Sequence, residues 1–169
     1  MSRFPEQIYS YSMKYKAYIM ISKILVPHDG TEMSDKALER AVELAKAFNA
    51  QLILLNVIEQ IPIPPSIMLG SDPVLIKKAR RSVMRGLEQG WNKLVEIKGH
   101  ELEKDKVSTT SDCIVGTAAD QILRYARTNK IDIIVMASAR LKGLSKIKAL
   151  GSVTRKVSEM ADCPVLIVH

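Results

Sequence analysis

The sequence is poor in cysteine and lacks a long apolar run, and both shortages exclude classes of protein. Cys113 and Cys163 are its only cysteines. Neither belongs to a Cys-x-x-Cys pair, so a disulfide framework, a thiol redox motif and a zinc site are not expected. No run of about eighteen apolar residues is present, which argues against a membrane-spanning helix. Charged residues interrupt the N-terminal segment where a signal peptide would have its apolar core. We therefore expect a reduced, cytoplasmic protein.

The sequence also lacks the signatures of common catalytic and nucleic-acid-binding proteins. Its three histidines, His28, His100 and His169, are isolated and show no metal-ligand spacing. No nucleophile stands with a base and a third, orienting group. The net charge of +7 would suit an anionic partner, but the basic residues are spread over several segments without an RNA- or DNA-binding motif. We predict neither an enzyme nor a nucleic-acid-binding protein.

What the sequence does contain is a regular alternation of short apolar runs and amphipathic stretches. The runs predict five strands, at 24–27, 52–57, 106–114, 131–136 and 164–168. Helical spacing predicts helices that end at Phe48, span 73–98 and 118–128, and open at Ser152. Thr31 or Ser34 can cap the first of them. The strands are apolar on both faces, so we predict a doubly wound α/β fold, an open five-stranded parallel sheet with helices on both faces.

The stretch 73–98 is expected to be one long, basic helix. Its predicted buried face consists of apolar residues at helical spacing: Val74, Ala79, Val83, Leu87, Trp91, Leu94 and Val95. Gly86 and Gly90 lower helix propensity in its middle and allow a kink there.

In such a sheet a ligand binds beyond the carboxyl ends of the strands, where the strand order reverses. That rule directs attention to the segments that follow the predicted strands: 27–30, Val57, 115–117 and 137–152. His28, beside Asp29, stands where a general base could act; the simpler interpretation is a loop residue of the turn.

These segments resemble the universal stress protein family. The run Lys23-Ile24-Leu25-Val26-Pro27-His28-Asp29-Gly30 is similar to the family's first strand and its Pro-x-Asp-Gly turn. The family's last helix and strand resemble Leu150-Gly151-Ser152-Val153-Thr154 and Asp162-Cys163-Pro164-Val165-Leu166-Ile167-Val168. Gly116 stands where a glycine commonly precedes the third helix. The resemblance covers 23–169, so we divide the chain into an N-terminal arm, 1–21, and a universal stress protein domain, 22–169.

The resemblance implies an adenine nucleotide alpha hydrolase-like, Rossmann-like fold, a homodimer formed through the C-terminal strand, and ATP or AMP as ligand. Asp29 and the backbone of Val57 would contact the adenine or ribose, and Gly151 and Ser152 the phosphates. A divalent metal would come only with the nucleotide. The full set of expected binding residues is Pro27, His28, Asp29, Val57, Gly116, Ala137, Ser138, Arg140, Gly151, Ser152, Val153 and Thr154. From the residues alone, Ser152 is equally a helix cap.

The phosphate loop departs from the pattern Gly-x-x-Gly-x9-Gly-Ser of ATP-binding members. Counting back from Gly151, the two leading glycines fall on Ser138 and Leu141, or on Ala137 and Arg140 if one residue is inserted. A non-glycine residue forced to positive φ costs about 1–2 kcal/mol. The same loop gains basic residues, which either bind phosphate in place of backbone amides or form a solvated surface: Arg140, Lys142, Lys146 and Lys148.

Two functions therefore remain open. One is a dimeric stress-response module that binds an adenine nucleotide through a degenerate phosphate loop. The other is an interaction protein with an empty site, acting through its dimer surface and the tyrosine-rich arm. The arm, with Tyr9, Tyr11, Tyr15 and Tyr18, is either an ordered packing element, a frayed terminus, or sequence upstream of a true start at Met13 or Met20.

Overall fold

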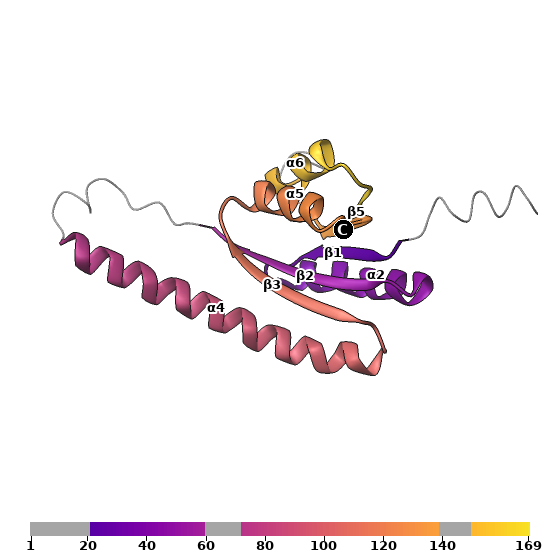
Figure 1. The fold of residues 1–169 in the computed structure, drawn as a ribbon, viewed down its shortest axis with the longest axis horizontal. Coiled ribbons are helices and arrows are strands. Elements are labelled where there is room, and N and C mark those ends of the chain that lie inside the picture. The colour runs from indigo at the N-terminus through magenta and orange to yellow at the C-terminus, as the bar shows by residue number, and fades with distance from the viewer. Residues whose placement is uncertain (1–20, 60–71, 139–149) are drawn as a thin grey trace, which may run out of the picture.

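A computed structural model describes residues 21–59, 72–138 and 150–169. These residues form a five-stranded parallel sheet with helices on both faces (Figure 1), which confirms the predicted fold class. The elements are β1 (Lys23–Pro27), α2 (Glu32–Phe48), β2 (Gln51–Ile58), α4 (Pro73–Lys104), β3 (Thr109–Val115), α5 (Ala118–Thr128), β4 (Ile133–Ala137), α6 (Ser152–Met160) and β5 (Val165–Val168). The N-terminal arm lies almost wholly outside the described residues.

The strand order is β3-β2-β1-β4-β5. The chain thus builds outward from β1 to β3 on one side and then returns to place β4 on the other side of β1. The reversal of strand order lies between β1 and β4, and β3 and β5 form the two edges of the sheet. By the rule for open α/β sheets, a ligand site is expected at the carboxyl ends of β1 and β4.

Alternation along the strands divides the core between the two faces of the sheet. Ile24 and Val26 of β1 face α2 and α4, whereas Leu25 faces α5 and α6. β2 and β4 alternate in the same way, with Leu54 on the first face and Leu55 on the second. Because successive side chains of a strand point to opposite faces, a strand buried on both sides reads as a continuous apolar run.

Local signals at the start of α2 resolve the choice between two caps. Thr31 is the N-cap, and its hydroxyl accepts a hydrogen bond from the amide of Ser34 at 3.3 Å. Ser34 lies inside the helix, and its hydroxyl donates to the carbonyl of Thr31 at 2.7 Å. Glu32 and Asp35 place negative charge in the first turn, where the helix dipole favours it.

α4 is longer than predicted, and the prediction of its buried face is wrong for its first half. Only Trp91 and Leu102 of this helix are buried, whereas Val74, Val83 and Leu87 are 72%, 50% and 45% exposed. The reason is length. A helix of 32 residues spans about 48 Å, while β2, with 8 residues, spans about 26 Å. Figure 1 shows the first turns of α4 projecting past the carboxyl end of β2.

β3 and β4 begin later than predicted, because polar turn contacts occupy the residues in front of them, and β5 begins one residue later, at Val165. Lys106 adopts a φ of +57° after the end of α4, so β3 starts only at Thr109. Asp132 is also outside its strand, since one of its carboxylate oxygens accepts the amides of Ser22 and Lys23 at 2.8 and 2.9 Å. In the described part of the chain no helix is both long and apolar enough to cross a membrane.

Because α4 is anchored only through its second half, we expect alanine substitutions at Trp91 and Leu87 to differ strongly in their effect on stability. We expect Trp91→Ala to lower the free energy of unfolding by about 3–5 kcal/mol, since it leaves a cavity against the sheet. Leu87→Ala, one turn earlier on the same helix, should cost less than about 1 kcal/mol because its side chain is already half exposed. Urea unfolding followed by circular dichroism measures both. Equal losses for the two variants would contradict this account of α4.

Candidate functional site

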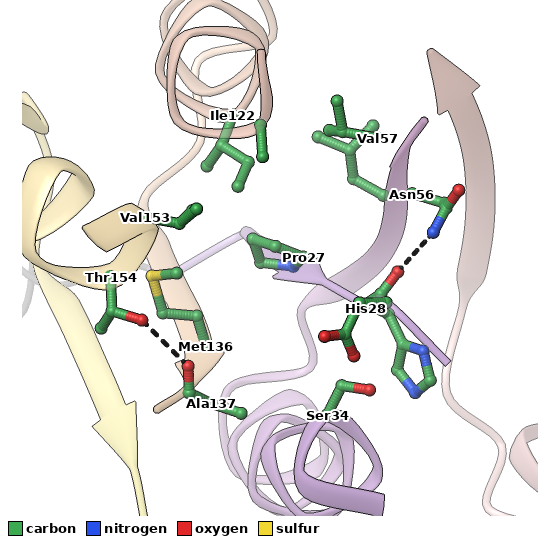
Figure 2. Close-up of a pocket in the computed structure, with 13 residues that line it drawn as sticks. Pro27, His28, Ser34, Asn56, Val57, Ile122, Met136, Ala137, Val153 and Thr154 are labelled. Atoms are coloured by element: carbon green, nitrogen blue, oxygen red, sulfur yellow. Dashed lines mark hydrogen bonds between the residues drawn. The ribbon is translucent and has the colours of Figure 1, made fainter. Parts of the chain in front are cut away.

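A cavity of about 250 Å³ lies at the carboxyl ends of the central strands, where the strand order reverses. Residues from three strands and three helices line it: Pro27, His28, Asp29, Ser34, Leu55, Asn56, Val57, Ala118, Ile122, Met136, Ala137, Val153 and Thr154. Figure 2 shows the labelled side chains converging from β1, β2, β4, α2, α5 and α6 and from the turn after β1. Its volume is slightly below the usual range for ligand pockets, about 300–1,000 Å³.

The turn between β1 and α2 forms one wall of this cavity. Gly30 has a φ of +85°, a left-handed conformation that glycine adopts without a steric penalty. Its amide donates to Nδ1 of His28 at 3.1 Å. On the other side of the turn, Oδ1 of Asp29 accepts from the amide of Thr31 at 3.1 Å and from its hydroxyl at 2.7 Å. The turn therefore holds both side chains in fixed positions.

Asp29 presents a negative charge to the cavity. Partial burial opposes its ionisation, but the hydrogen bonds from Thr31 outweigh this and lower the pKa of Asp29 below its usual value. An ionised carboxylate only accepts hydrogen bonds, so this position suits a ligand that offers hydroxyl groups.

The end of β2 forms the opposite wall. The ladder between β1 and β2 ends at the pair Pro27–Leu55, followed by one further bond from the amide of His28 to the carbonyl of Leu55 at 2.9 Å. β2 nevertheless continues to Ile58, whose carbonyl accepts the amide of Gly116 from the β3 side. Since backbone groups alternate in direction along a strand, Val57 directs its N–H and C=O toward the β1 side, beyond the last β1 partner.

Asn56 ties β2 to the turn and was not among the predicted site residues. Its Nδ2 donates to the carbonyl of His28 at 2.8 Å (Figure 2). The thiol of Cys113 donates to its Oδ1 at 3.7 Å. Burial raises the pKa of Cys113, so the thiol keeps the proton that it donates. A polar residue inside an otherwise apolar strand was the signal available in the sequence, and it indicates a fixed backbone attachment here.

The third wall comes from β4 and the start of α6. The Thr154 hydroxyl donates to the carbonyl of Ala137 at 3.2 Å and so fastens α6 to the strand end (Figure 2). Gly151, and not Ser152, is the N-cap of α6; Ser152 is its first helical residue and is exposed. Ser138, directly after Ala137, is 2% exposed, and its hydroxyl has no hydrogen-bond partner among the described residues.

The structure brings seven of the predicted residues to the cavity and leaves four beside it. Pro27, His28, Asp29, Val57, Ala137, Val153 and Thr154 line it, while Gly116, Ser138, Gly151 and Ser152 do not. Arg140 lies outside the described residues, as do Leu141, Lys142, Lys146 and Lys148. Sequence reasoning missed Ser34, Leu55, Asn56, Ala118, Ile122 and Met136, most of which read simply as core residues. Within the described ranges, no three His, Cys, Asp or Glu side chains gather in a way that could hold a metal ion.

A parallel sheet of this order with a cavity at its switch point defines the doubly wound α/β class of ligand-binding folds. Within that class the assignment is specific. The sequence pattern described as "Universal stress protein family" matches residues 20–169, and the chain belongs to this family.

Individual relatives agree with this assignment. The universal stress protein YxiE of Bacillus subtilis is 36% identical over 153 residues, covering 89% of this chain and all of that protein. The structure of UspA from Lactobacillus plantarum shares the fold with a TM-score of 0.75 at 19% identity, over 89% of this chain and 99% of that one. A family member from Arabidopsis thaliana, solved with AMP bound, has a TM-score of 0.61 at 16% identity, over 87% and 90% of the two chains.

Gly116 and Gly151, two of the turn glycines next to the site, should differ in how much stability they lose on substitution by alanine. Gly116 has a φ of +151°, and an added Cβ would lie 2.3–2.9 Å from the side chain of Gln121. Gly116→Ala should therefore lower the free energy of unfolding by about 1–3 kcal/mol. Gly151 has a φ of −58° and open space around its Cα, so Gly151→Ala should cost less than about 1 kcal/mol, mainly because alanine is a poorer N-cap than glycine. Thermal unfolding of both variants checks this; a Gly151 variant as unstable as the Gly116 variant would refute it.

Proposed function

We propose that this member of the universal stress protein family is a homodimeric binding module for an adenine nucleotide, ATP or AMP. One observation carries the proposal: a backbone donor and acceptor on Val57 that have no β1 partner in the described chain, and an ionised carboxylate on Asp29, face one cavity at the switch point of the sheet. The relative solved with AMP bound supports the choice of ligand class.

The adenine half of the proposal follows from Val57. A single strand residue offers one N–H donor and one C=O acceptor, side by side on the same edge. Adenine offers the complementary pair on its Watson–Crick edge, an acceptor at N1 and a donor at the exocyclic amine. The apolar side chains of Ile122, Met136 and Val153 can contact the faces of the base.

The ribose half follows from Asp29. Hydroxyl groups of a sugar donate hydrogen bonds to a carboxylate, and in dinucleotide-binding folds an acidic residue accepts such bonds from the ribose. The lowered pKa of Asp29 keeps the acceptor ionised at neutral pH. We therefore expect the hydrogen bond between Asp29 and the ribose to keep its strength at every pH above about 5.

The phosphates are assigned to the start of α6. Unpaired amides at a helix N-terminus favour an anion, and α6 begins at Ser152 beside the cavity residue Val153. Arg140 would add charge from the neighbouring loop. A divalent metal would be brought by the phosphates.

The direct test is whether the protein carries or binds a nucleotide. We expect ATP or AMP in the supernatant of heat-denatured protein, or saturable heat on titration with either one. If the supernatant is empty and calorimetry with both nucleotides is silent, the site is empty, and the alternative function, an interaction protein of the same family, replaces this proposal.

A single substitution tests the role of the carboxylate. Asp29→Asn should weaken nucleotide binding about tenfold or more, since a charge-assisted hydrogen bond is worth about 1.5–3 kcal/mol. Asp162→Asn is the matched control, because Asp162 pairs with Arg127 and lines a different part of the surface. Calorimetric titration with AMP measures both variants. Equal affinities for Asp29→Asn and the unmodified protein would exclude Asp29 from the site.

The homodimer is assigned to β5, an edge strand of the sheet. An edge strand offers a row of backbone donors and acceptors for pairing with another chain, and Leu166 on β5 is 39% exposed. We expect Leu166→Lys to convert the dimer to a monomer in light scattering. Val115→Lys, at a similarly exposed position on the opposite edge strand β3, should leave the dimer intact. A dimer that survives the first substitution and not the second would place the interface on the wrong edge.

A further inference from the structure

His28 is the only histidine of the described chain that is buried, with 2% of its surface exposed. Both of its ring nitrogens have partners. The amide of Gly30 donates to Nδ1 at 3.1 Å, and Nε2 lies 3.1 Å from Oδ1 of Asp35. A backbone amide can only donate, so Nδ1 must be the unprotonated nitrogen, and the neutral ring carries its proton on Nε2. The surrounding bonds therefore specify a single tautomer.

The same carboxylate connects the ring to α4. Oδ1 of Asp35 also accepts from Nζ of Lys98 at 3.1 Å. Burial alone would raise the pKa of Asp35, but the hydrogen bonds from Lys98 and His28 outweigh it and lower that pKa. Trp91, one of the two buried residues of α4, lies with its ring 6.0 Å from the His28 ring, centre to centre. α2, α4 and the β1–α2 turn thus meet at one side chain.

We propose that His28 is a positioning residue for the candidate site: its neutral Nε2–H form fixes the turn that presents Asp29, and ties that turn to α4 through Asp35 and Lys98. The inference deepens the proposed function and rests on it wherever nucleotide affinity is concerned. Its central contact is the bond from Gly30 to Nδ1, because Gly30 follows Asp29 directly and sets the direction of the turn.

Protonation would break this arrangement. An imidazolium carries protons on both nitrogens, so Nδ1 would confront the amide of Gly30 with a second donor. The charged groups facing the ring are Asp35 on α2, Lys98 on α4 and Asp29 on its own turn. Burial lowers the pKa of His28 below 6.5, against the raising effect of the two carboxylates, and Lys98 lowers it further. The ring is therefore neutral at pH 7.

The sign of the pH effect follows from linkage. An unfolded histidine has a pKa of about 6.5, above that of folded His28. Between these two values the unfolded or locally opened turn binds a proton that the native turn does not. The native turn is hence fully favoured above about pH 6.5 and loses stability as the pH falls toward the folded pKa. Nucleotide affinity should decline over the same interval.

The test uses nuclear magnetic resonance of the full-length protein without nucleotide between pH 7.5 and 5. We expect the His28 ring nitrogens to show an unprotonated Nδ1 and a protonated Nε2, and the Gly30 and Thr31 amides to titrate together with that ring, with a midpoint below 6.5. His100, which is exposed, serves as the internal control. A His28 ring with the other tautomer, or Gly30 and Thr31 amides that do not follow its titration, would overturn the proposal.

Two substitutions of His28 separate the contacts of its ring. Asn places an acceptor oxygen where Nδ1 was, so His28→Asn should keep the turn, bind AMP at pH 7.5 more tightly than His28→Leu does, and abolish the low-pH titration of Gly30. His28→Leu leaves the Gly30 amide without an acceptor and should weaken AMP binding about tenfold. If His28→Leu binds AMP as tightly as the unmodified protein does, His28 has no positioning role.

The titration midpoint of the His28 ring tests the link to α4 separately. Lys98→Met removes a cation that lowers the His28 pKa, so the titration midpoint of the ring should rise. Lys93→Met, on the same helix, should leave it unchanged. An unchanged midpoint in the Lys98 variant would remove α4 from the proposal. Should the unmodified protein bind no nucleotide while the ring and the Gly30 amide titrate as expected, the proposed function fails and the positioning of the turn by His28 stands.

Discussion

The ladder between β1 and β2 stops while β2 still has three residues to run, and the site depends on this mismatch. After Pro27 the chain leaves the sheet through a turn, whereas β2 continues to Ile58. The mismatch leaves Val57, which is paired with β3 on its other side, without a β1 partner at the place where the strand order reverses. If β1 continued for two more residues, it would pair with Val57 and occupy the space of the cavity.

The turn that ends β1 must therefore be held rigidly, and polar groups hold it. Asn56 attaches to the carbonyl of His28, Thr31 bridges to Asp29, and the ring of His28 accepts the amide of Gly30. Each bond satisfies a polar group near the core, so the loss of one bond leaves a donor or acceptor unpaired and lowers the free energy of unfolding. The apolar core on both faces supplies stability, and these bonds supply the shape of the site.

Periodicity was enough to predict the layers of the fold. The helix predicted over 118–128 has the observed bounds, and the five strands are all present. The burial of α4 was mispredicted because helical spacing identifies an apolar face but not the length of the sheet beneath it; Val83 and Leu87 lie past the end of that support. The predicted starts of β3 and β4 were early because Lys106 and Asp132 take part in turns that only the folded chain reveals.

The site was predictable in part. Asp29 and Val57 came from a family resemblance, and the structure places both at the cavity, while their binding roles stay predictions. The sequence showed a polar Asn56 inside an apolar strand, but it could not identify its partner His28 or the network from His28 to Lys98, because these residues are 28 and 70 positions apart in the chain. The most direct measurement is the amide spectrum of the protein titrated with AMP. The account predicts that the Val57 amide is among the most strongly shifted and saturates with the ligand; an unshifted Val57 amide at saturating AMP would contradict it.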